Sequence, residues 1–316
     1  MSDTSDRILG EPNLGSMFAN IFSFLSRPLS RDIEAADVVV MGVPYDLATS
    51  GRSGARLGPT GIRQASINLS WEEKRWPWRF DVFERLKVID YGDVCFDTGD
   101  SEGMIASLQS HADQVIGAGK TLISLGGDHF IALPLLRSHE KKYGKLSLIH
   151  FDAHTDTEAS DVKYNHGSMF YHAVKEQIVD PTGSIQIGIR TEYEQASHPF
   201  EVLDAGFVSE ASTAEIVQAI KKRLNGGPAY ISFDIDCLDP AYAPGTGTPV
   251  AGGMTTVQIL NILRGLVGEN IVGMDLVEVA PAYDHADITS LAAATIVLEV
   301  LYVLAATTDD CSGILP

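Results

Sequence analysis

The sequence predicts a single three-layer α/β/α domain around a mostly parallel sheet of about eight strands. Short apolar runs rich in Val and Ile alternate with segments of helical length, which is typical of parallel strands buried on both faces. The chain has 316 residues, 45% of them hydrophobic, which is ample for one large core. Because neither an internal repeat nor a separating linker is visible, we expect an N-terminal arm over 1–36, one domain over 37–308 and a tail over 309–316.

The first strand is predicted at 37–43, where the chain has a continuous β-branched apolar run. A glycine-rich loop, 44–58, follows it, and Pro59 then stands at a favourable first position for a helix. This loop has neither a Gly-x-Gly-x-x-Gly nor a P-loop pattern, so we do not expect it to bind a nucleotide. Residues 1–36 lack a clear period, and we interpret them as an arm that packs on the body or on another subunit. Within the arm, a short helix or clasp is indicated by Phe18, Ile21, Phe22, Phe24 and Leu25.

Strand and helix patterns alternate through the rest of the chain, in units of ordinary length. The further predicted strands are 87–90, 121–125, one around Ile149, 184–190, one near Val202, 229–233 and 271–279. The predicted helices are 101–118, one that carries Leu133, Leu135 and Leu136, 169–177, 213–224, 255–267 and 290–306. Loop 70–80 interrupts this rhythm with three tryptophans that suit ordinary packing, a rim of the active site or a subunit contact, namely Trp71, Trp76 and Trp78.

The charge balance argues against several classes of partner. The chain carries 23 Lys and Arg against 42 Asp and Glu, a formal net charge of −19. This charge repels nucleic acid and anionic membrane surfaces and attracts cationic small molecules, although solubility alone also explains it. No run of 18 or more apolar residues and no signal peptide is visible, so we expect a cytoplasmic protein. The cysteines, Cys95, Cys237 and Cys311, lie far apart and indicate neither a disulfide framework nor a thiolate metal cage.

Polar side chains cluster where predicted strands end. Asp152, His154 and Asp156 alternate after the apolar run around Ile149, and a strand would direct alternate side chains to the same side. Burial of two carboxylates and an imidazole costs several kcal/mol or more unless a positive charge meets them. A metal ion satisfies that requirement.

Three other strand exits carry similar residues: His129 in Gly-Gly-Asp-His, the pair Asp234 and Asp236, and Glu278. A lone Asp or His after a strand is more often a helix cap or a solvated residue. Sites in open parallel sheets, however, form beyond the carboxyl ends of the strands, where all these exits would meet. We therefore predict a metal site that contains His129, Asp152, His154, Asp156, Asp234 and Asp236. Oxygen-rich ligands with some imidazole and no thiolate suit Mn²⁺ better than Zn²⁺.

These motifs resemble the ureohydrolases, the family of arginases, agmatinases and related amidinohydrolases. The resemblance covers about 38–306 and is carried by Gly-Gly-Asp-His, Phe-Asp-Ala-His-Thr-Asp, His-Gly-Ser-Met-Phe, Ser-Phe-Asp-Ile-Asp-Cys-Leu-Asp-Pro and Pro-Gly-Thr-Gly-Thr-Pro. It looks closest to the bacterial agmatinase branch, which implies an arginase-like fold, a role in polyamine biosynthesis and a homo-oligomer, either a trimer or a hexamer.

The resemblance also implies two Mn²⁺ ions per chain with a bridging water or hydroxide, in a domain, 37–308, that carries the catalysis. One ion would take His129, Asp152, Asp156 and Asp234, and the other would take Asp152, His154, Asp234 and Asp236. Asp152 and Asp234 would bridge the two ions. The implied reaction is hydrolysis of the guanidinium group of agmatine, a small cation, to putrescine and urea.

Two further residues match catalytic positions of the family. Glu278 matches the carboxylate that hydrogen-bonds the guanidinium group, and its alternative role is an ordinary ion pair with a nearby Arg. His166 matches the histidine that is proposed to shuttle protons, and its alternative role is a helix cap. The histidines outside the motifs are expected to be solvated or core residues, namely His111, His139, His172, His198 and His285.

The loop between Asp156 and His166 bears on the substrate. It does not reproduce the Ser/Asn-rich segment with which arginases bind the α-amino and α-carboxylate groups of arginine. We place Tyr164 against the four-carbon chain of agmatine as a substrate-binding residue. Glu158 and Asp161 favour an amine at the far end of the substrate, whereas Lys163 favours the carboxylate of 4-guanidinobutyrate.

Three alternatives to an agmatine-hydrolysing enzyme stay open at this point. The first is a guanidinobutyrase or another ω-guanidino-acid ureohydrolase. The second is a non-catalytic protein of the same family, which the complete set of predicted ligands disfavours. The third is a zinc deacetylase on the same fold, which would keep one metal ion.

Overall fold

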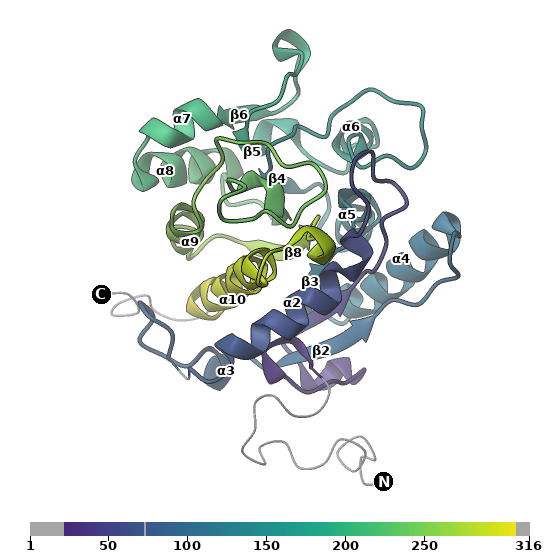
Figure 1. Cartoon of the computed structure of the whole chain (residues 1–316), viewed down its shortest axis with the longest axis vertical. Helices are drawn as coiled ribbons and strands as arrows, with labels where there is room; N and C mark the ends of the chain where they lie inside the picture. The colour runs from purple at the N-terminus through teal and green to yellow at the C-terminus, as the bar shows by residue number, and fades with distance from the viewer. Residues whose placement is uncertain (1–21, 73, 308–316) are drawn as a thin grey trace, which may run out of the picture.

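The computed structural model describes residues 22–72 and 74–307. An eight-stranded sheet lies between two layers of helices, as the sequence predicts (Figure 1). The predicted tail 309–316 lies outside the described residues, as do Phe18 and Ile21 of the arm. The division into arm, domain and tail therefore stays a prediction.

The sheet has the strand order β2-β1-β3-β8-β7-β4-β5-β6, and all its neighbouring strands pair in parallel. The strands are β1 (Val38–Gly42), β2 (Val88–Asp93), β3 (Thr121–Leu125), β4 (Ser147–Phe151), β5 (Ile185–Ile189), β6 (Glu201–Asp204), β7 (Ala229–Asp234) and β8 (Ile271–Val277). The α-helices are α2 (Gly58–Ser66), α3 (Val82–Arg85), α4 (Ser101–Gly117), α5 (Ala132–Tyr143), α6 (Met169–Lys175), α7 (Ala205–Glu210), α8 (Thr213–Leu224), α9 (Thr256–Arg264) and α10 (Ile288–Thr307). The sequence patterns did not predict α3 and α7, because both are too short to show a helical period.

The sheet buries both faces because alternate residues of each strand point to opposite sides. In β1, Val38 and Val40 enter the core under α2, α9 and α10, whereas Val39 and Met41 enter the core under α4, α5 and α6. The helices α8 and α3 join the first of these layers. Most strand residues are therefore apolar, although a few buried polar residues, such as Gln186 of β5, also lie within the strands.

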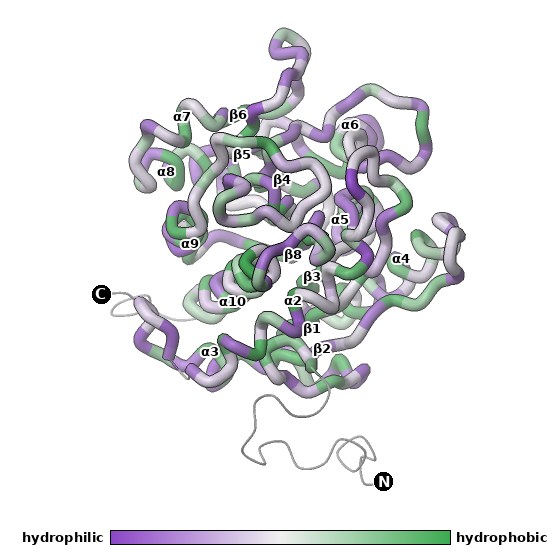
Figure 2. The backbone as a smooth tube through the Cα atoms, in the orientation of Figure 1, coloured by the Kyte–Doolittle hydropathy of each residue, from purple (hydrophilic) through white to green (hydrophobic). Residues whose placement is uncertain are grey.

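The helix α10 has the length and mean hydropathy, 2.1, of a membrane-spanning helix, and Figure 2 shows its hydrophobic colouring. However, 83% of its most apolar window is buried inside the domain, where it packs on α2 and α9. Glu299 interrupts its apolar sequence and accepts hydrogen bonds from Trp78 Nε1 and Arg264 Nε, each at 2.7 Å. These features identify α10 as a core helix, and no other candidate span occurs among residues 22–72 and 74–307.

The tryptophan loop divides between core and surface. Trp78 is buried and stacks on Tyr302 with ring centroids 5.3 Å apart, which is ordinary packing. Trp71 and Trp76 are 67% and 79% exposed. The described part of the arm lies beside this loop, where Ser26 Oγ is 3.4 Å from Ser70 Oγ, and it packs on the sheet, where Phe24 N donates to Asp90 Oδ2 at 2.7 Å.

Candidate metal centre

The predicted ligands converge because their strands are neighbours in the sheet. β3, β8, β7 and β4 stand side by side, and parallel strands end at the same edge. His129 begins the 3₁₀ turn after β3, and Asp234 ends β7. Asp152 follows β4 directly, and Glu278 follows β8. Residues far apart in the sequence thus meet at one edge.

The first group of donor atoms surrounds His129, which is fully buried. Its Nδ1 lies 3.1 Å from Asp152 Oδ2, 2.9 Å from Asp156 Oδ2 and 3.3 Å from Asp234 Oδ2. Neighbouring ligands that each lie about 2.1 Å from one octahedral ion stand about 3 Å apart. The spacing of this group is therefore that of donors around a single small cation.

The second group is centred on His154, whose Nδ1 lies 3.2 Å from Asp152 Oδ1 and 3.1 Å from Asp236 Oδ2. Asp152 therefore belongs to both groups and offers one carboxylate oxygen to each. For Asp234, Oδ2 faces His129 and Oδ1 accepts a hydrogen bond from Asp236 N at 2.8 Å. The bridging role of Asp234 remains a prediction.

The hydrogen bonds of His129 assign its tautomer. Its Nε2 lies 2.9 Å from Ser232 Oγ, and Ser232 Oγ lies 2.8 Å from Asp275 Oδ1. Because a carboxylate accepts, Ser232 donates to Asp275 and accepts from His129 Nε2–H. Nδ1 then presents a lone pair to the three carboxylates, and it has no hydrogen-bond partner among the described residues. This arrangement fits a metal ion, because a ligating His commonly donates its other N–H to a supporting group.

The pKa shifts show the same need for positive charge. Burial lowers the pKa of His154, but Asp152 and Asp236 outweigh it and raise that pKa to about 12. Burial, together with Asp152, raises the pKa of Asp156 to about 7. Because the buried carboxylates repel one another, they are stable together only if protons or a cation lie between them.

Glu278 and His166 lie beside the first group. Glu278 is buried, and its Oε1 accepts from His129 N at 2.9 Å and lies 2.8 Å from His166 Nδ1. Its Oε2 is buried without a partner among the described residues. The backbone of Glu278 has a φ of +64°, a region that costs a non-glycine residue about 1–3 kcal/mol. These contacts argue against an ordinary ion pair with Arg.

His166 has a defined tautomer as well. Its Nε2 lies 2.9 Å from Ser50 N and 2.7 Å from Ser50 Oγ. A backbone N–H can only donate, so Nε2 accepts and the proton sits on Nδ1, directed at Glu278. Burial lowers the pKa of His166, but Glu278 outweighs it and raises that pKa to about 9. The Ser50 N–H opposes this second protonation, and since its direction is fixed by the backbone we assign the neutral ring.

The other predicted substrate contact is Tyr164, in the loop between Asp156 and His166. Its ring packs edge-on against Phe130 with centroids 5.6 Å apart, and its hydroxyl donates to Glu102. Lys163 forms an ion pair with the same Glu102. The role of Tyr164 in substrate binding stays a prediction, based on its position beside the residue that follows His129.

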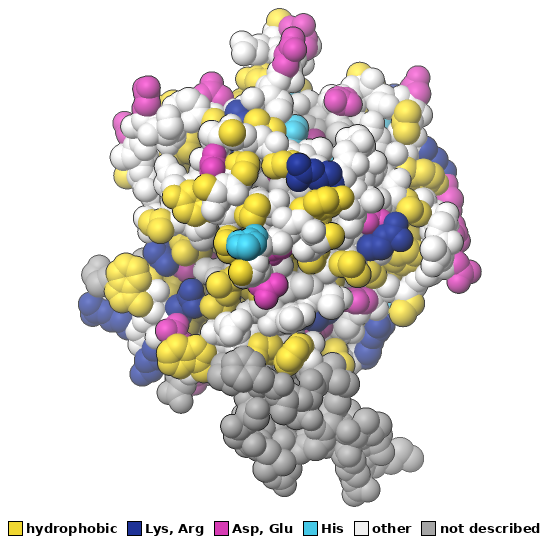
Figure 3. Space-filling model, in the orientation of Figure 1, with side chains coloured by type: hydrophobic (Ala, Val, Ile, Leu, Met, Phe, Trp, Pro, Cys, Tyr) yellow, Lys and Arg dark blue, Asp and Glu magenta, His cyan; other side chains and the backbone are white. Residues whose placement is uncertain are grey.

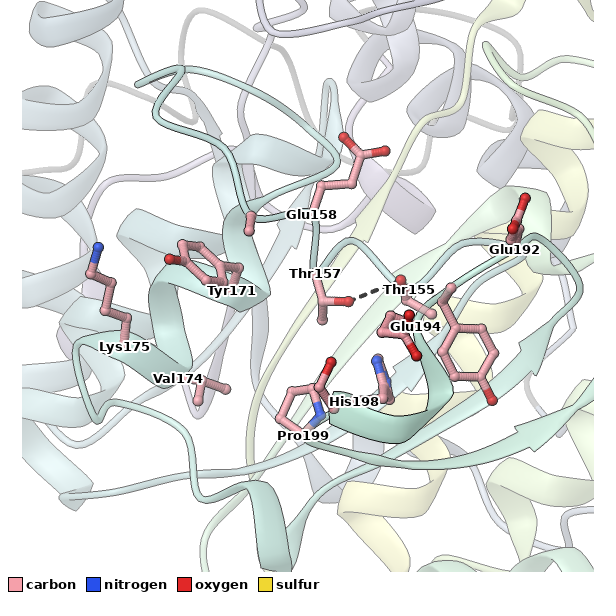
Figure 4. A pocket seen from close by; sticks show the side chains of 13 residues that line it. Thr155, Thr157, Glu158, Tyr171, Val174, Lys175, Glu192, Glu194, His198 and Pro199 are labelled. Carbon is pink, nitrogen blue, oxygen red and sulfur yellow. Dashed lines mark hydrogen bonds between the residues drawn. The ribbon is translucent and has the colours of Figure 1, made fainter.

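A surface pocket of about 580 Å³ lies next to the site (Figure 4). It is formed between the loop after Asp156, helix α6 and the loop from Glu192 to Pro199. Figure 4 shows Thr157 and Tyr171 across from His198 and Pro199. The loop between β5 and β6 protrudes at the top of Figures 1 and 3, where acidic side chains are exposed. Thr155 and Thr157, which flank Asp156, connect the pocket wall to the metal centre.

Sequence reasoning missed several supporting residues: Ser50, His150, Gln186, Ser232 and Asp275. His150 lies within 4.8 Å of the first group, but both of its ring nitrogens already have partners, Asp152 and Gln186. We therefore place it outside the ligand set. The alternation of Asp152, His154 and Asp156 extends back to His150, and this pattern is the sequence feature that could have identified His150 as a supporting residue.

Comparison with known proteins agrees with these features. A family model described as the Arginase family matches residues 36–302. The Agmatinase of Serratia proteamaculans (strain 568) is 53% identical over 300 residues, which cover 94% of this chain and 98% of that protein. The Agmatinase of Neisseria meningitidis serogroup B (MC58) is 56% identical over 296 residues, 93% of this chain and 96% of that protein.

Solved structures show the same similarity. A crystal structure of a hypothetical agmatinase from Burkholderia thailandensis superposes with a TM-score of 0.90 and 49% identity, over 93% of each chain. Proclavaminate amidino hydrolase from Streptomyces clavuligerus superposes with a TM-score of 0.87 and 35% identity, over 93% of this chain and 100% of that one. The similarity thus extends over sequence and fold together.

Proposed function

This chain belongs to the arginase family, and we propose that it hydrolyses the guanidinium group of agmatine to putrescine and urea with two Mn²⁺ ions. The observation that carries the proposal is the pair of donor groups that share Asp152, next to the unpartnered Oε2 of Glu278. The named agmatinases at 53% and 56% identity support agmatine as the substrate.

The ligand set fits two divalent ions. His129, Asp152, Asp156 and Asp234 would hold one ion, and Asp152, His154, Asp234 and Asp236 would hold the other. When bound, the two ions would lower the pKa of a water molecule and so supply the nucleophile at neutral pH. Carboxylates with imidazole and no thiolate favour Mn²⁺ over softer metals. We place buried Cys237 outside the set, because burial raises the pKa of its thiol and Asp236 raises it further.

The charges of the site favour a cationic substrate. The carboxylates of Asp152, Asp156, Asp234 and Asp236 balance two divalent ions, so Glu278 adds a net negative charge. Its Oε2 accepts from the planar guanidinium group, while its Oε1 stays bound to His129 N and His166 Nδ1. Glu278 thereby orients the guanidinium carbon relative to the ligand groups.

His166 is placed to move protons. Its Nδ1–H is held by Glu278, and its Nε2 accepts from Ser50. A proton taken up at Nε2 would convert the ring to an imidazolium that Glu278 stabilises, and the ring can pass it to the departing amine or to Ser50 Oγ. An imidazole suits this role because it can both accept and donate a proton.

The loop chemistry favours agmatine over the alternatives. Lys163 is the only basic residue between Asp156 and His166, and it is paired with Glu102. It is therefore less available for the carboxylate of 4-guanidinobutyrate. We further propose a cytoplasmic homo-oligomer, a trimer or a hexamer, without nucleic-acid or membrane partners; the charge of −19 supports the last point.

The test is urea release from the Mn²⁺-loaded protein with agmatine, arginine and 4-guanidinobutyrate in parallel. A site without partners for the carboxylate of arginine leaves that charge unsatisfied, a penalty of several kcal/mol. We expect kcat/KM for agmatine to exceed that for arginine by at least ~1,000-fold, with 4-guanidinobutyrate between them. Asp152→Ala controls for contaminating activity.

Comparable rates on arginine would refute the agmatine assignment, and a best rate on 4-guanidinobutyrate would make the protein a guanidinobutyrase. No urea from any of the three substrates, with the metal bound, would favour a non-catalytic protein. A single bound ion per chain would favour the deacetylase alternative.

A further inference from the structure

A buried hydrogen-bond chain leads from the metal centre to the wall of the surface pocket. It begins at Asp152, whose Oδ2 lies 2.8 Å from His150 Nε2. His150 Nδ1 lies 2.8 Å from Gln186 Nε2, and Gln186 Oε1 lies 2.7 Å from His198 Nε2. His198 lines the pocket of about 580 Å³ (Figure 4). Asp152, His150 and Gln186 are each fully buried.

One backbone carbonyl fixes the direction of every hydrogen bond in this chain. The amide nitrogen of Gln186 also lies 2.7 Å from Thr155 O. Because a carbonyl can only accept, the Gln186 atom that faces it must be the NH₂ group, and the flipped amide would set two oxygens against each other. The second hydrogen of that NH₂ group then points at His150 Nδ1, which must accept. The proton of His150 is therefore on Nε2 and is donated to Asp152.

The same logic orders the outer end. Gln186 Oε1 faces His198 Nε2, so Nε2 of His198 carries the proton and donates. The strand pairing supports this geometry, because His150 and Gln186 are register partners in β4 and β5. Each buried polar atom of Gln186 is thereby satisfied.

We propose that His150 is a positioning residue that, held in one tautomer by Gln186 and Thr155, orients the Asp152 carboxylate between the two donor groups. This inference rests on the proposed two-metal site. Asp152 Oδ1 accepts from His154 N at 2.6 Å and faces the second group, whereas Oδ2 faces His129. The hydrogen bond from His150 to Oδ2 fixes the rotation of the carboxylate, so each oxygen keeps its own group.

Two substitutions of His150 separate its two hydrogen bonds. Gln can place its amide nitrogen near the position of imidazole Nε2 and so keep the donor to Asp152. Asn is shorter; it can still accept from Gln186 but cannot reach Asp152. The outer-chain control is His198→Ala, because Thr155 O alone already fixes the amide of Gln186.

The experiment measures Mn²⁺ dissociation constants and stoichiometry by electron paramagnetic resonance for the wild type and the three variants. The melting temperature of the metal-free proteins serves as a check on folding. Loss of a group that supports a ligand typically weakens metal binding ~10- to 100-fold, and we expect a loss of this size for His150→Asn. His150→Gln should lose less than ~5-fold and His198→Ala less than ~3-fold.

Equal Mn²⁺ affinity in His150→Asn and the wild type would overturn the proposal. Equal losses in His150→Asn and His150→Gln would also overturn it, because they would show a packing role. If His198→Ala weakened Mn²⁺ binding as much as His150→Asn, His198 would be needed to hold the tautomer of His150. That result would refute the proposal that Thr155 O fixes it through Gln186. If the wild type itself binds no Mn²⁺, the proposed function fails, and that result is seen before any variant is compared.

Discussion

Replacement of Glu278 by Gln should lower kcat/KM for agmatine about 100- to 1,000-fold while both ions stay bound. Gln keeps the shape of Glu, and its Oε1 can still accept from His129 N and His166 Nδ1, since both are donors. The NH₂ group must then occupy the position of the unpartnered Oε2. It would present a donor to the guanidinium donors in place of an acceptor.

The magnitude follows from the lost charge. A unit charge about 4 Å from the guanidinium contributes about 4 kcal/mol at an effective dielectric constant of about 20. Each 1.36 kcal/mol is tenfold in rate, so complete loss corresponds to about 1,000-fold. The lower limit of about 100-fold allows for a remaining contact with the amide.

The assay is steady-state urea release, with metal content measured by elemental analysis on the same samples. Glu176→Gln is the matched control, because it removes an equal charge at an exposed ion pair with Arg137 and should leave kcat/KM unchanged. A kcat/KM within tenfold of the wild type for Glu278→Gln would refute the guanidinium contact. Loss of metal from this variant would instead show that Glu278 supports the ligands.

Asp152→Ala should empty both metal sites, because each donor group loses a carboxylate oxygen. Asp234→Ala should do the same if Asp234 also bridges the two ions, and an Asp234→Ala protein that keeps two ions by elemental analysis would contradict that bridging role. His166→Asn should lower kcat ~10- to 1,000-fold without loss of metal, because the Asn amide can still donate to Glu278 but cannot carry a proton; full turnover at neutral pH would eliminate the shuttle. Burial lowers the pKa of His139 to about 4, below the value of about 6.5 in the unfolded chain. Burial of the neutral ring therefore contributes fully to the free energy of unfolding above pH 6.5, and this contribution is lost as the pH falls towards 4. Between pH 7.5 and pH 5 the wild type should therefore lose about 2 kcal/mol more of its free energy of unfolding than His139→Leu, as measured by urea unfolding. An equal loss in both proteins would show that His139 does not cause the pH dependence.

The sequence predicted the strands well because a strand is a local pattern. The candidate ligand residues also stand in local motifs, and the structure brings them together, but their binding of metal stays a prediction. The strand 121–125 and the helix 213–224 agree with the observed bounds of β3 and α8. Strand order was not predictable, since nothing local to β8 shows that it pairs with β3 and β7. The supporting residues are equally non-local. Ser50 contacts His166 from a glycine-rich loop far away in the sequence, and His198 hydrogen-bonds Gln186 from the loop after β5.

The central position of β8 has a consequence for the order in which the molecule assembles. β8 stands between β3 on one flank of the sheet and β7 on the other, so it joins the half that bears His129 to the half that bears Asp152. Until this late segment of the chain has been inserted, the two halves of the ligand set have no common scaffold. Such long-range closure is slow compared with the formation of local helices. An ion held by His129 together with Asp152, Asp156 and Asp234 would therefore stabilise only the completed sheet, whereas the donors of the second group stand at the ends of β4 and β7, which pair without β8.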